Sequence, residues 1–370
     1  MKKGELRPVC SLGMFDFFKG LAILSVIWGH TVELFPMNSG SVGGLIGYSL
    51  GNLSVYAFFI SAGYGIRKRP AAKCFDQVYK TFVIPYLYAL VATPILLTAV
   101  HARSFHYLPG ALVEGLHVLT GFCLGQYPTT TYFGWLTYSC GPLWFVVALA
   151  VAWIIFNVLL NRVKEKWLPW AVGVIGLLGF FSSQLINQLE IAVPFCLTHA
   201  LITVPCLYLG YWAKKAHFFE KKPTTAMWIA FAASVALYIF GFSRPQSFSS
   251  QEYPFGPLSL LSFFIVSMGL LYLMTHINRR YNAVVNAFER VGYNTIDILV
   301  LHTIEYYGML WYRVAERFAE RPNLGIAVIL ALRALFIVAG LLLKALFKKT
   351  NGFRDLKAAF PKQEKQAEKV

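Results

Sequence analysis

Apolar runs of about 18–25 residues, the length of a membrane-crossing helix, follow one another along most of this chain. Only 14% of the 370 residues are charged, whereas a soluble domain has about 25%. A water-soluble globule of this size would lack the polar side chains to cover its surface. The sequence therefore predicts an all-α, polytopic membrane helix bundle, because helices satisfy their own backbone hydrogen bonds in lipid.

About ten transmembrane helices are expected, with both the N- and C-termini in the cytoplasm. The expected spans are 15–35, 42–66, 82–101, 142–160, 167–186, 191–213, 224–242, 257–277, 292–312 and 324–347. Lysine and arginine concentrate in alternate connections, at 2–7, 67–80, 162–166, 214–222, 279–290 and from 344 onward. The other connections hold few, namely Arg103, Arg244, Arg313, Arg317 and Arg321. This positive-inside pattern favours both the number of spans and their orientation.

The net charge of +16 does not indicate nucleic acid as a partner. The basic residues form short clusters between apolar runs instead of a continuous stripe, and such clusters are typical of a topology signal. The six cysteines show no metal-ligand spacing, so neither a metal site nor a bound cofactor is expected. Cys123 and Cys140 share one outer connection and could form a disulfide.

The domain organisation is simple. Residues 1–350 are expected to form one integral-membrane domain, and 351–370 a polar cytoplasmic tail. The first apolar run contains charges and is too long for a cleaved signal peptide. The connection 102–141 is long and moderately apolar, and two interpretations remain open: an ordinary outer loop, or an interfacial or re-entrant helix.

The first span carries an unusual set of ionisable residues, each costing about 2.5–3.5 kcal/mol to insert. At 3.6 residues per turn, one stripe of the helix is formed by Asp16, Lys19, Ile23, Val26, Ile27 and His30. Glu33 lies one turn beyond His30 and could hydrogen-bond its ring. We expect the stripe to face the interior of the bundle, with His30 about 16 Å from Lys19 along the axis.

Each group in this stripe has two interpretations. A shielded histidine oriented by a carboxylate suits a general base, but His30 could also be a packed histidine bonded to a neighbouring helix. Asp16 and Lys19 could serve catalysis, or they could neutralise each other near the cytoplasmic interface. Arg333 also lies inside a span.

A second ionisable cluster lies in the expected span 292–312. His302 and Glu305 form an i, i+3 pair, whereas Asp297 points elsewhere. His199, which lies in a span beside two prolines, is interpreted as a structural histidine that caps a kink.

Four motifs, in order along the chain, carry a family resemblance. They are FDFFKGLAILSVIWGH at 15–30, FFISAGYGIRKR at 58–69, KTFVIPYL at 80–87 and GYNTIDILVLHTIEY at 292–306, with GPLWFVVAL at 141–149 as a weaker fifth. With these motifs the chain resembles the acyltransferase-3 family of integral-membrane acyltransferases, whose first span has a basic residue, ten residues and then histidine. The resemblance implies a multi-pass protein of the cell (cytoplasmic) membrane.

The chain departs from the family pattern at three places. Lys19 stands where arginine is more usual, Ala62 is inserted in the Ser-Gly pair, and Lys80 stands where many relatives have two arginines. Lysine keeps the charge but loses the bidentate fork of arginine. Gripping of phosphate or carboxylate at Lys19 and Lys80 is therefore in question.

The resemblance implies an O-acetyltransferase-like reaction. An acyl group, most often acetyl, would pass from cytoplasmic acyl-coenzyme A to a hydroxyl of a cell-surface glycan or its lipid-linked precursor, next to membrane lipids. His30 would be the base, Asp16 or Glu33 would orient or balance it, and Lys19 would guide the donor or support Asp16. The residues expected to bind substrate are Arg67, Lys68, Arg69, Lys80, Trp144, His302 and Glu305.

Other function classes remain open from the sequence. The basic group at 67–80 suits coenzyme A phosphates, or it serves topology alone. Intramembrane charges are also typical of proton-coupled transporters, although no inverted repeat is visible. A third class is an uptake or sensory domain without acyl-transfer activity.

Overall fold

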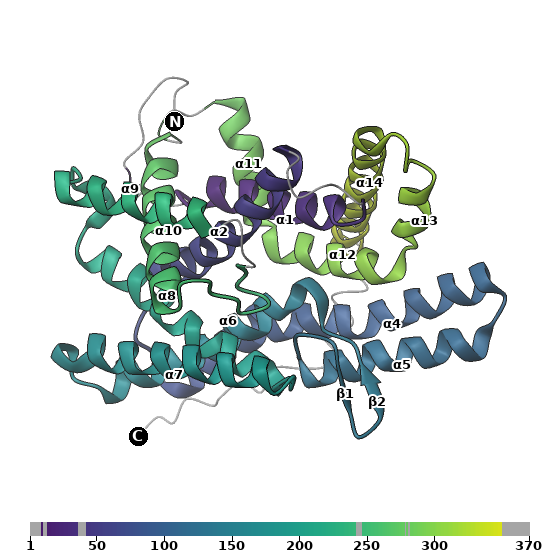
Figure 1. Cartoon of the computed structure of the whole chain (residues 1–370), viewed down its shortest axis with the longest axis horizontal. Helices are drawn as coiled ribbons and strands as arrows, with labels where there is room; N and C mark the ends of the chain where they lie inside the picture. The colour runs from purple at the N-terminus through teal and green to yellow at the C-terminus, as the bar shows by residue number, and fades with distance from the viewer. Residues whose placement is uncertain are drawn as a thin grey trace.

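The computed structural model describes residues 9, 13–35, 42–241, 246–277, 279 and 282–349, with the backbone alone at 42–52 and 348–349. The chain is mostly helical (Figure 1). Its helices are α1 (Asp16–Val32), α2 (Val42–Gly65), α3 (Ala71–Val78), α4 (Ile84–Phe105), α5 (Leu108–Leu124), α6 (Trp144–Arg162), α7 (Leu168–Gln188), α8 (Leu197–Lys215), α9 (Thr225–Phe240), α10 (Pro257–Ile277), α11 (Ala283–Tyr293), α12 (Thr295–Gly308), α13 (Trp311–Glu316) and α14 (Pro322–Lys349). A π-helical turn, η1 (Tyr79–Val83), joins α3 to α4, and two short strands, β1 (Thr130–Tyr132) and β2 (Trp135–Thr137), pair antiparallel.

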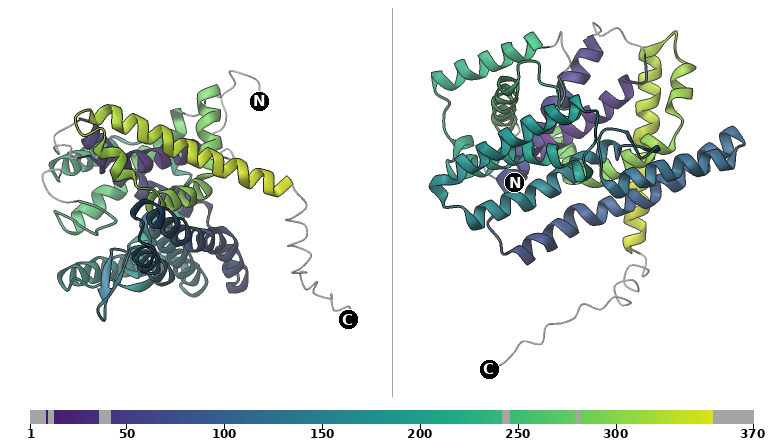
Figure 2. Two further views of the ribbon diagram at one scale, coloured as in Figure 1. Left: turned by 90° about the vertical axis from the view of Figure 1, so that its right-hand side faces the viewer. Right: turned by 60° about the horizontal axis from the view of Figure 1, so that its bottom comes forward.

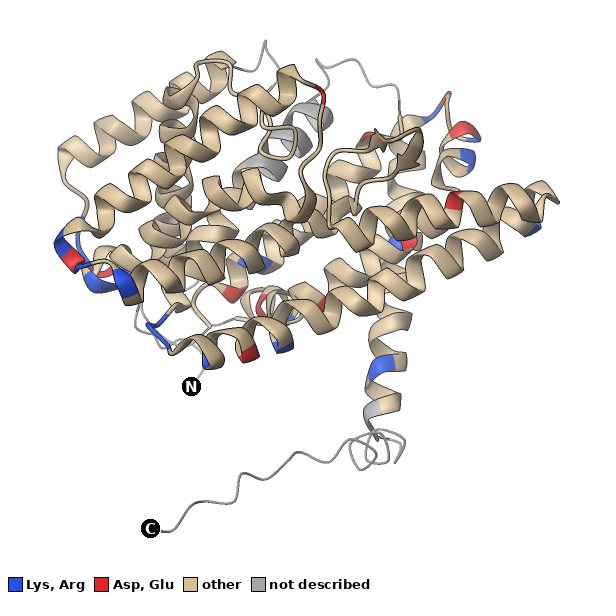
Figure 3. Ribbon diagram, turned by 90° about the horizontal axis from the view of Figure 1, so that it is seen from below, with Lys and Arg blue, Asp and Glu red and all other residues tan. Residues whose placement is uncertain are grey.

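Six helical segments of the described chain are long and apolar enough to cross a membrane. They are Ala71–Phe105, Gly141–Arg162, Glu165–Gln188, Pro194–Lys215, Pro257–Ile277 and Pro322–Phe347. Three shorter apolar helices accompany them, Leu53–Gly65, Leu108–Leu124 and Thr225–Phe240. Charged residues lie mainly near helix ends, and most of the helical surface carries none (Figure 3). The predominantly helical fold with several candidate membrane spans is confirmed, whereas the count of ten spans and the orientation stay predictions.

The expected span 292–312 is not one helix. Thr295 Oγ1 donates to the carbonyl of Gly292 at 2.6 Å, and Asn294 Nδ2 donates to the carbonyl of Arg290 at 2.8 Å. These local side-chain bonds end α11 and compete with a continuous helix. The following helix α12 has 14 residues, about 21 Å of helix, which is shorter than the ~30 Å hydrocarbon layer.

The segment 102–141 is not an ordinary loop. His106 takes the left-handed conformation, with φ 54°, and ends α4, and Pro109 then stands at the start of α5. Helix α5 returns along α4, where the Tyr86 hydroxyl donates to the carbonyl of Phe122 at 2.6 Å. This hairpin extends past the other helices on one side of the molecule (Figure 1).

The disulfide that Cys123 and Cys140 could have formed is absent. Cys123 and Cys140 are both free, and they lie in different surroundings, because Cys123 is exposed and Cys140 is buried. The shared connection therefore contains two free thiols.

Helix α1 lies in direct backbone contact with α11. A Cβ atom at Gly20 would lie 2.1 Å from the carbonyl oxygen of Phe288, and one at Gly292 would lie 1.8 Å from that of Asp16. Such distances leave no room for a side chain, so the glycines are what allow the two helices to meet. Small residues serve this purpose widely in membrane helix packing.

Helix α14 completes the surroundings of α1. It crosses one side of the bundle as a long helix and extends beyond it (Figure 2). Along the way it packs against α12, α13 and α1. This packing places α14 beside His30, in the last turn of α1.

Candidate functional site

The site is built around His30, in the last turn of α1. A cavity of about 150 Å³ opens there between α1, α2, α12, the start of α6 and the segment 246–256. It is lined by Ile23, Ser25, Val26, Gly29, His30, Glu33, Val55, Phe58, Pro142, Trp144, Phe145, Ser247, Ser249, Thr295 and Leu299. The C-terminal part of the predicted stripe, Ile23, Val26 and His30, therefore lines a cavity inside the bundle, as expected.

Asp16 and Lys19 do not share this cavity. They form an ion pair of 2.5 Å between Lys19 Nζ and Asp16 Oδ1, with side chains 32% and 22% exposed respectively. Neither residue lines the cavity. This geometry favours the interpretation in which the two charges neutralise each other at the start of α1, away from His30.

His30 is oriented by Glu33. Its Nδ1 lies 3.1 Å from Glu33 Oε2, and the imidazole is 27% exposed while the carboxylate is 65% exposed. An ionised carboxylate can only accept, so Nδ1 carries the proton in this bond. The Nε2 atom is then the basic nitrogen, and the pair is suited to remove a proton from a substrate in the cavity.

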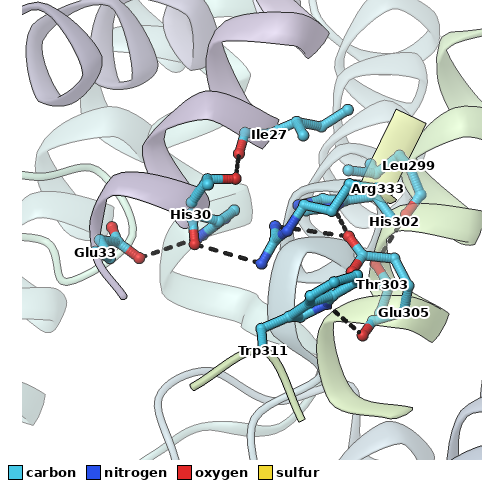
Figure 4. A network of polar contacts seen from close by, with 10 residues as sticks. Ile27, His30, Glu33, Leu299, His302, Thr303, Glu305, Trp311 and Arg333 are labelled. Atoms are coloured by element: carbon cyan, nitrogen blue, oxygen red, sulfur yellow. Dashed lines mark hydrogen bonds and ion pairs between the residues drawn. The ribbon is translucent and has the colours of Figure 1, made fainter. Parts of the chain in front are cut away.

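A second histidine–glutamate pair lies behind the first, fully buried. His302 Nδ1 donates to Glu305 Oε1 at 2.5 Å. The indole Nε1 of Trp311 donates to both the Glu305 carboxylate and, at 3.0 Å, the Glu305 carbonyl. Arg333 Nη1 lies 3.6 Å from Glu305 Oε1 and balances its charge inside the protein (Figure 4). A buried carboxylate needs such compensation.

The two pairs belong to one network (Figure 4). The rings of His30 and His302 lie 5.5 Å apart, and the ring of Tyr306 lies 5.2 Å from that of His30. Arg333 Nη2 donates to the backbone carbonyl of His30 at 3.5 Å, and its guanidinium lies over the Trp311 ring at 5.4 Å. The network therefore joins α1, α12, α13 and α14 around His30.

His302 keeps one nitrogen without a hydrogen bond. Its Nε2 is buried and has no hydrogen-bond partner within the described part of the chain. Because Nδ1 carries the proton that Glu305 accepts, Nε2 is the basic nitrogen of this ring as well.

Arg333 is the main residue of the network for which the sequence pattern predicted no role. The sequence did mark Arg333 as unusual, because an arginine inside an apolar helix requires a partner or a function. Its partner, Glu305, could not be identified without the packing of α14 on α12. Asp297, by contrast, was expected to point away from His302, and it does: it pairs with Lys344 of α14.

Trp144 forms a wall of the cavity, and its expected role in binding substrate stays a prediction. It stacks on Phe248, with ring centroids 5.5 Å apart and planes 19° apart. His199 lies 5.1 Å from Trp144, and its Nε2 donates to the Ser249 carbonyl at 2.8 Å. His199 is thus a structural histidine, as interpreted, but it holds the segment 246–256 against the site instead of capping a kink.

The predicted donor-binding residues lie apart from the cavity. Arg67 and Lys68 are exposed, and Lys80 is exposed and pairs with Asp76 at 2.6 Å. Asn157 holds the connection after α2 through the backbone of Arg69, accepting from its N–H and donating to its carbonyl, both at 3.1 Å. The backbone at Arg69 is therefore held in place, while the charged ends of Arg67, Lys68 and Lys80 remain exposed.

No metal centre accompanies the site within the described ranges, where no group of three or more His, Cys, Asp and Glu side chains could hold an ion. The chemistry available at the cavity is that of imidazole, carboxylate, hydroxyl and aromatic groups.

An oriented histidine in a cavity of a multi-pass helical bundle defines a membrane protein with the means for acid–base catalysis. The family model described as "Acyltransferase domain" matches residues 13–345. The chain belongs to the acyltransferase-3 family, as its motifs indicated, and the match supports a membrane acyltransferase in general. Searches of curated proteins and of solved structures gave no match.

Proposed function

We propose that the protein transfers an acyl group, with acetyl the first candidate, from cytoplasmic acyl-coenzyme A to a hydroxyl of a cell-surface glycan or its lipid-linked precursor. The observation that carries this proposal is the His30–Glu33 pair facing a cavity walled by Trp144. The family membership supports acyl transfer as the reaction class.

In the proposed reaction, the acceptor hydroxyl oxygen attacks the thioester carbonyl carbon while its proton passes to His30 Nε2. The carbon–sulfur bond then breaks, and the sulfur of coenzyme A takes that proton and leaves as the thiol. Glu33 holds the imidazole in place and stabilises its protonated form. A thioester is already activated, so positioning and proton transfer are the main tasks of the protein.

The buried pair supports this base without touching substrate. His302 and Glu305 were expected to bind substrate, but both side chains are 0% exposed and neither lines the cavity. We assign them, with Arg333, the role of holding the His30 backbone and ring in place.

The two substrates are proposed to arrive from opposite ends. The exposed cations Arg67, Lys68 and Lys80 suit the phosphates of coenzyme A, and the face of Trp144 suits a sugar ring. Because His30 lies about 16 Å from Lys19 along α1, the pantetheine arm or the acyl group would have to enter the bundle.

The test is an assay of membranes containing the protein with labelled acetyl- or succinyl-coenzyme A. We expect label in the glycan fraction with the wild type and none with His30→Ala, at equal protein levels. His217→Ala is a matched control, because His217 also bonds a glutamate three residues later, Glu220, at 2.8 Å outside the cavity.

Two outcomes would contradict the proposal. Full activity of His30→Ala would remove the assignment of the base. Protein-dependent solute flux without label incorporation from either donor would identify a transporter instead.

A further inference from the structure

A second concave site lies away from His30, between α8, α9 and α10. It is a groove of about 280 Å³, and its lining is almost entirely apolar. The lining residues are Leu209, Trp212, Phe218, Pro223, Met227, Trp228, Ala230, Phe231, Leu261, Phe264, Ile265, Met268, Gly269 and Tyr272. None of them belongs to the cavity of His30.

The depth of the groove depends on a glycine. A Cβ atom at Gly269 would lie 2.3 Å from the ring of Phe231, so any larger residue would push that ring into the groove. The floor of the groove is thus formed where α9 and α10 pack against each other.

The groove has the length of one bilayer leaflet. Its lining on α10 runs from Leu261 to Tyr272, which is about 16 Å of helix, or about half of the ~30 Å hydrocarbon layer. Trp212 and Trp228 are partly exposed along it, and tryptophan is enriched at the level of lipid headgroups.

One end of the groove is basic. The connection between α8 and α9 carries Lys214, Lys215, Lys221 and Lys222. Lys215 pairs with Glu165, but Lys221 and Lys222 are exposed and form no ion pair with any carboxylate of the described ranges. The Tyr272 hydroxyl donates to the Lys221 carbonyl at 3.2 Å, which fixes this connection against the end of the groove.

We propose that the groove binds one acyl chain of an anionic phospholipid from the leaflet at this basic end, with Lys221 and Lys222 at its phosphate headgroup. An apolar channel of one-leaflet length suits an acyl chain, and two free ammonium groups beside interfacial tryptophans suit a negative headgroup. Basic pockets between membrane helices bind anionic headgroups for this reason.

The test measures the phospholipid retained by the purified full-length protein after reconstitution in phosphatidylglycerol or phosphatidylcholine nanodiscs and extraction into detergent, using native mass spectrometry. We expect phosphatidylglycerol to be retained preferentially, and Lys221→Gln/Lys222→Gln to weaken its retention roughly tenfold. Ala230→Trp places a large ring in the groove from an exposed position and is expected to reduce retention of either lipid.

Lys164→Gln/Lys166→Gln is the matched control, since it removes the same charge from an exposed neighbouring connection. Equal retention of the two lipids by the wild type would overturn the proposal. An equal loss in the control pair would do so too, because it would show attraction by the net charge of this end instead of a site.

Discussion

The two histidines of the site, His30 and His302, each bond a glutamate three residues later, yet their surroundings are opposite. His30 and Glu33 line an open cavity, and the carboxylate is 65% exposed. His302 and Glu305 are 0% exposed and are enclosed by Arg333 and Trp311. The spacing on the helix creates the hydrogen bond in both cases, and the neighbouring helices decide whether the pair can meet a substrate.

The difference also separates stability from catalysis. Breaking a buried ion pair leaves a charge without compensation and costs about 3–5 kcal/mol, whereas an exposed pair contributes about 0–1 kcal/mol. The buried pair should therefore govern folding, and the cavity pair should govern turnover.

The largest effect is expected for Glu305→Ala. The variant leaves the buried Arg333 guanidinium without its carboxylate and should lower the free energy of unfolding by about 3–5 kcal/mol. Thermal unfolding of the detergent-purified protein measures this, with Glu33→Ala as the matched control. Equal melting temperatures for the two variants would abolish the distinction between the pairs.

Glu33→Gln is expected to act on turnover instead. A neutral amide orients the His30 ring poorly and does not stabilise its protonated form, so kcat should fall about 10- to 100-fold. KM and the melting temperature should remain near wild type. Steady-state acyl transfer tests this, and Glu316→Gln, an exposed glutamate on α13, should behave like wild type. A change confined to KM would assign Glu33 to substrate binding.

Arg333→Lys examines how far the two pairs are linked. Lysine keeps the positive charge beside Glu305 but loses the planar fork that also reaches the His30 carbonyl. We expect a loss of about 1–2 kcal/mol in stability and a several-fold lower kcat. Arg313→Lys, on a guanidinium that lies over Phe105, is the control. Unchanged kcat in Arg333→Lys would show that the buried pair does not position His30.

The smallest effect is expected for Asp16→Asn. The Asp16–Lys19 pair is partly exposed and does not line the cavity, so its loss should cost less than about 1 kcal/mol and leave acyl transfer within a few-fold. The same two assays measure it. A loss of activity as large as that of His30→Ala would show that Asp16 and Lys19 take part in catalysis after all.

Local periodicity predicted the correct inner face of α1 at His30, because the direction of a side chain on a helix depends only on its position along it. The same stripe misled at its other end. A straight stripe about 16 Å long passes from one environment into another, so Asp16 and Lys19 are partly exposed and do not share the cavity of His30.

Two features could not be predicted from the sequence pattern. The partnership of Arg333 and Glu305 depends on where α14 crosses α12, and no sequence spacing encodes that crossing. Side-chain bonds to the backbone accompany the break at Asn294, at the start of the expected span, and the extended backbone of Met309 ends α12. Hydropathy averages over such bonds and therefore predicted one uninterrupted span.

The contact of α1 with α11 makes the position of the proposed base, His30, sensitive to a distant residue. Gly20 lies ten positions before His30 on the same helix, about 15 Å away, and meets the Phe288 carbonyl with no space to spare. A methyl group added at Gly20 would push α1 away from α11 and tilt it. The tilt would displace the imidazole of His30. A displacement near 1 Å can slow an enzyme about a hundredfold. Gly20→Ala, although far from the cavity, could therefore abolish most of the proposed activity.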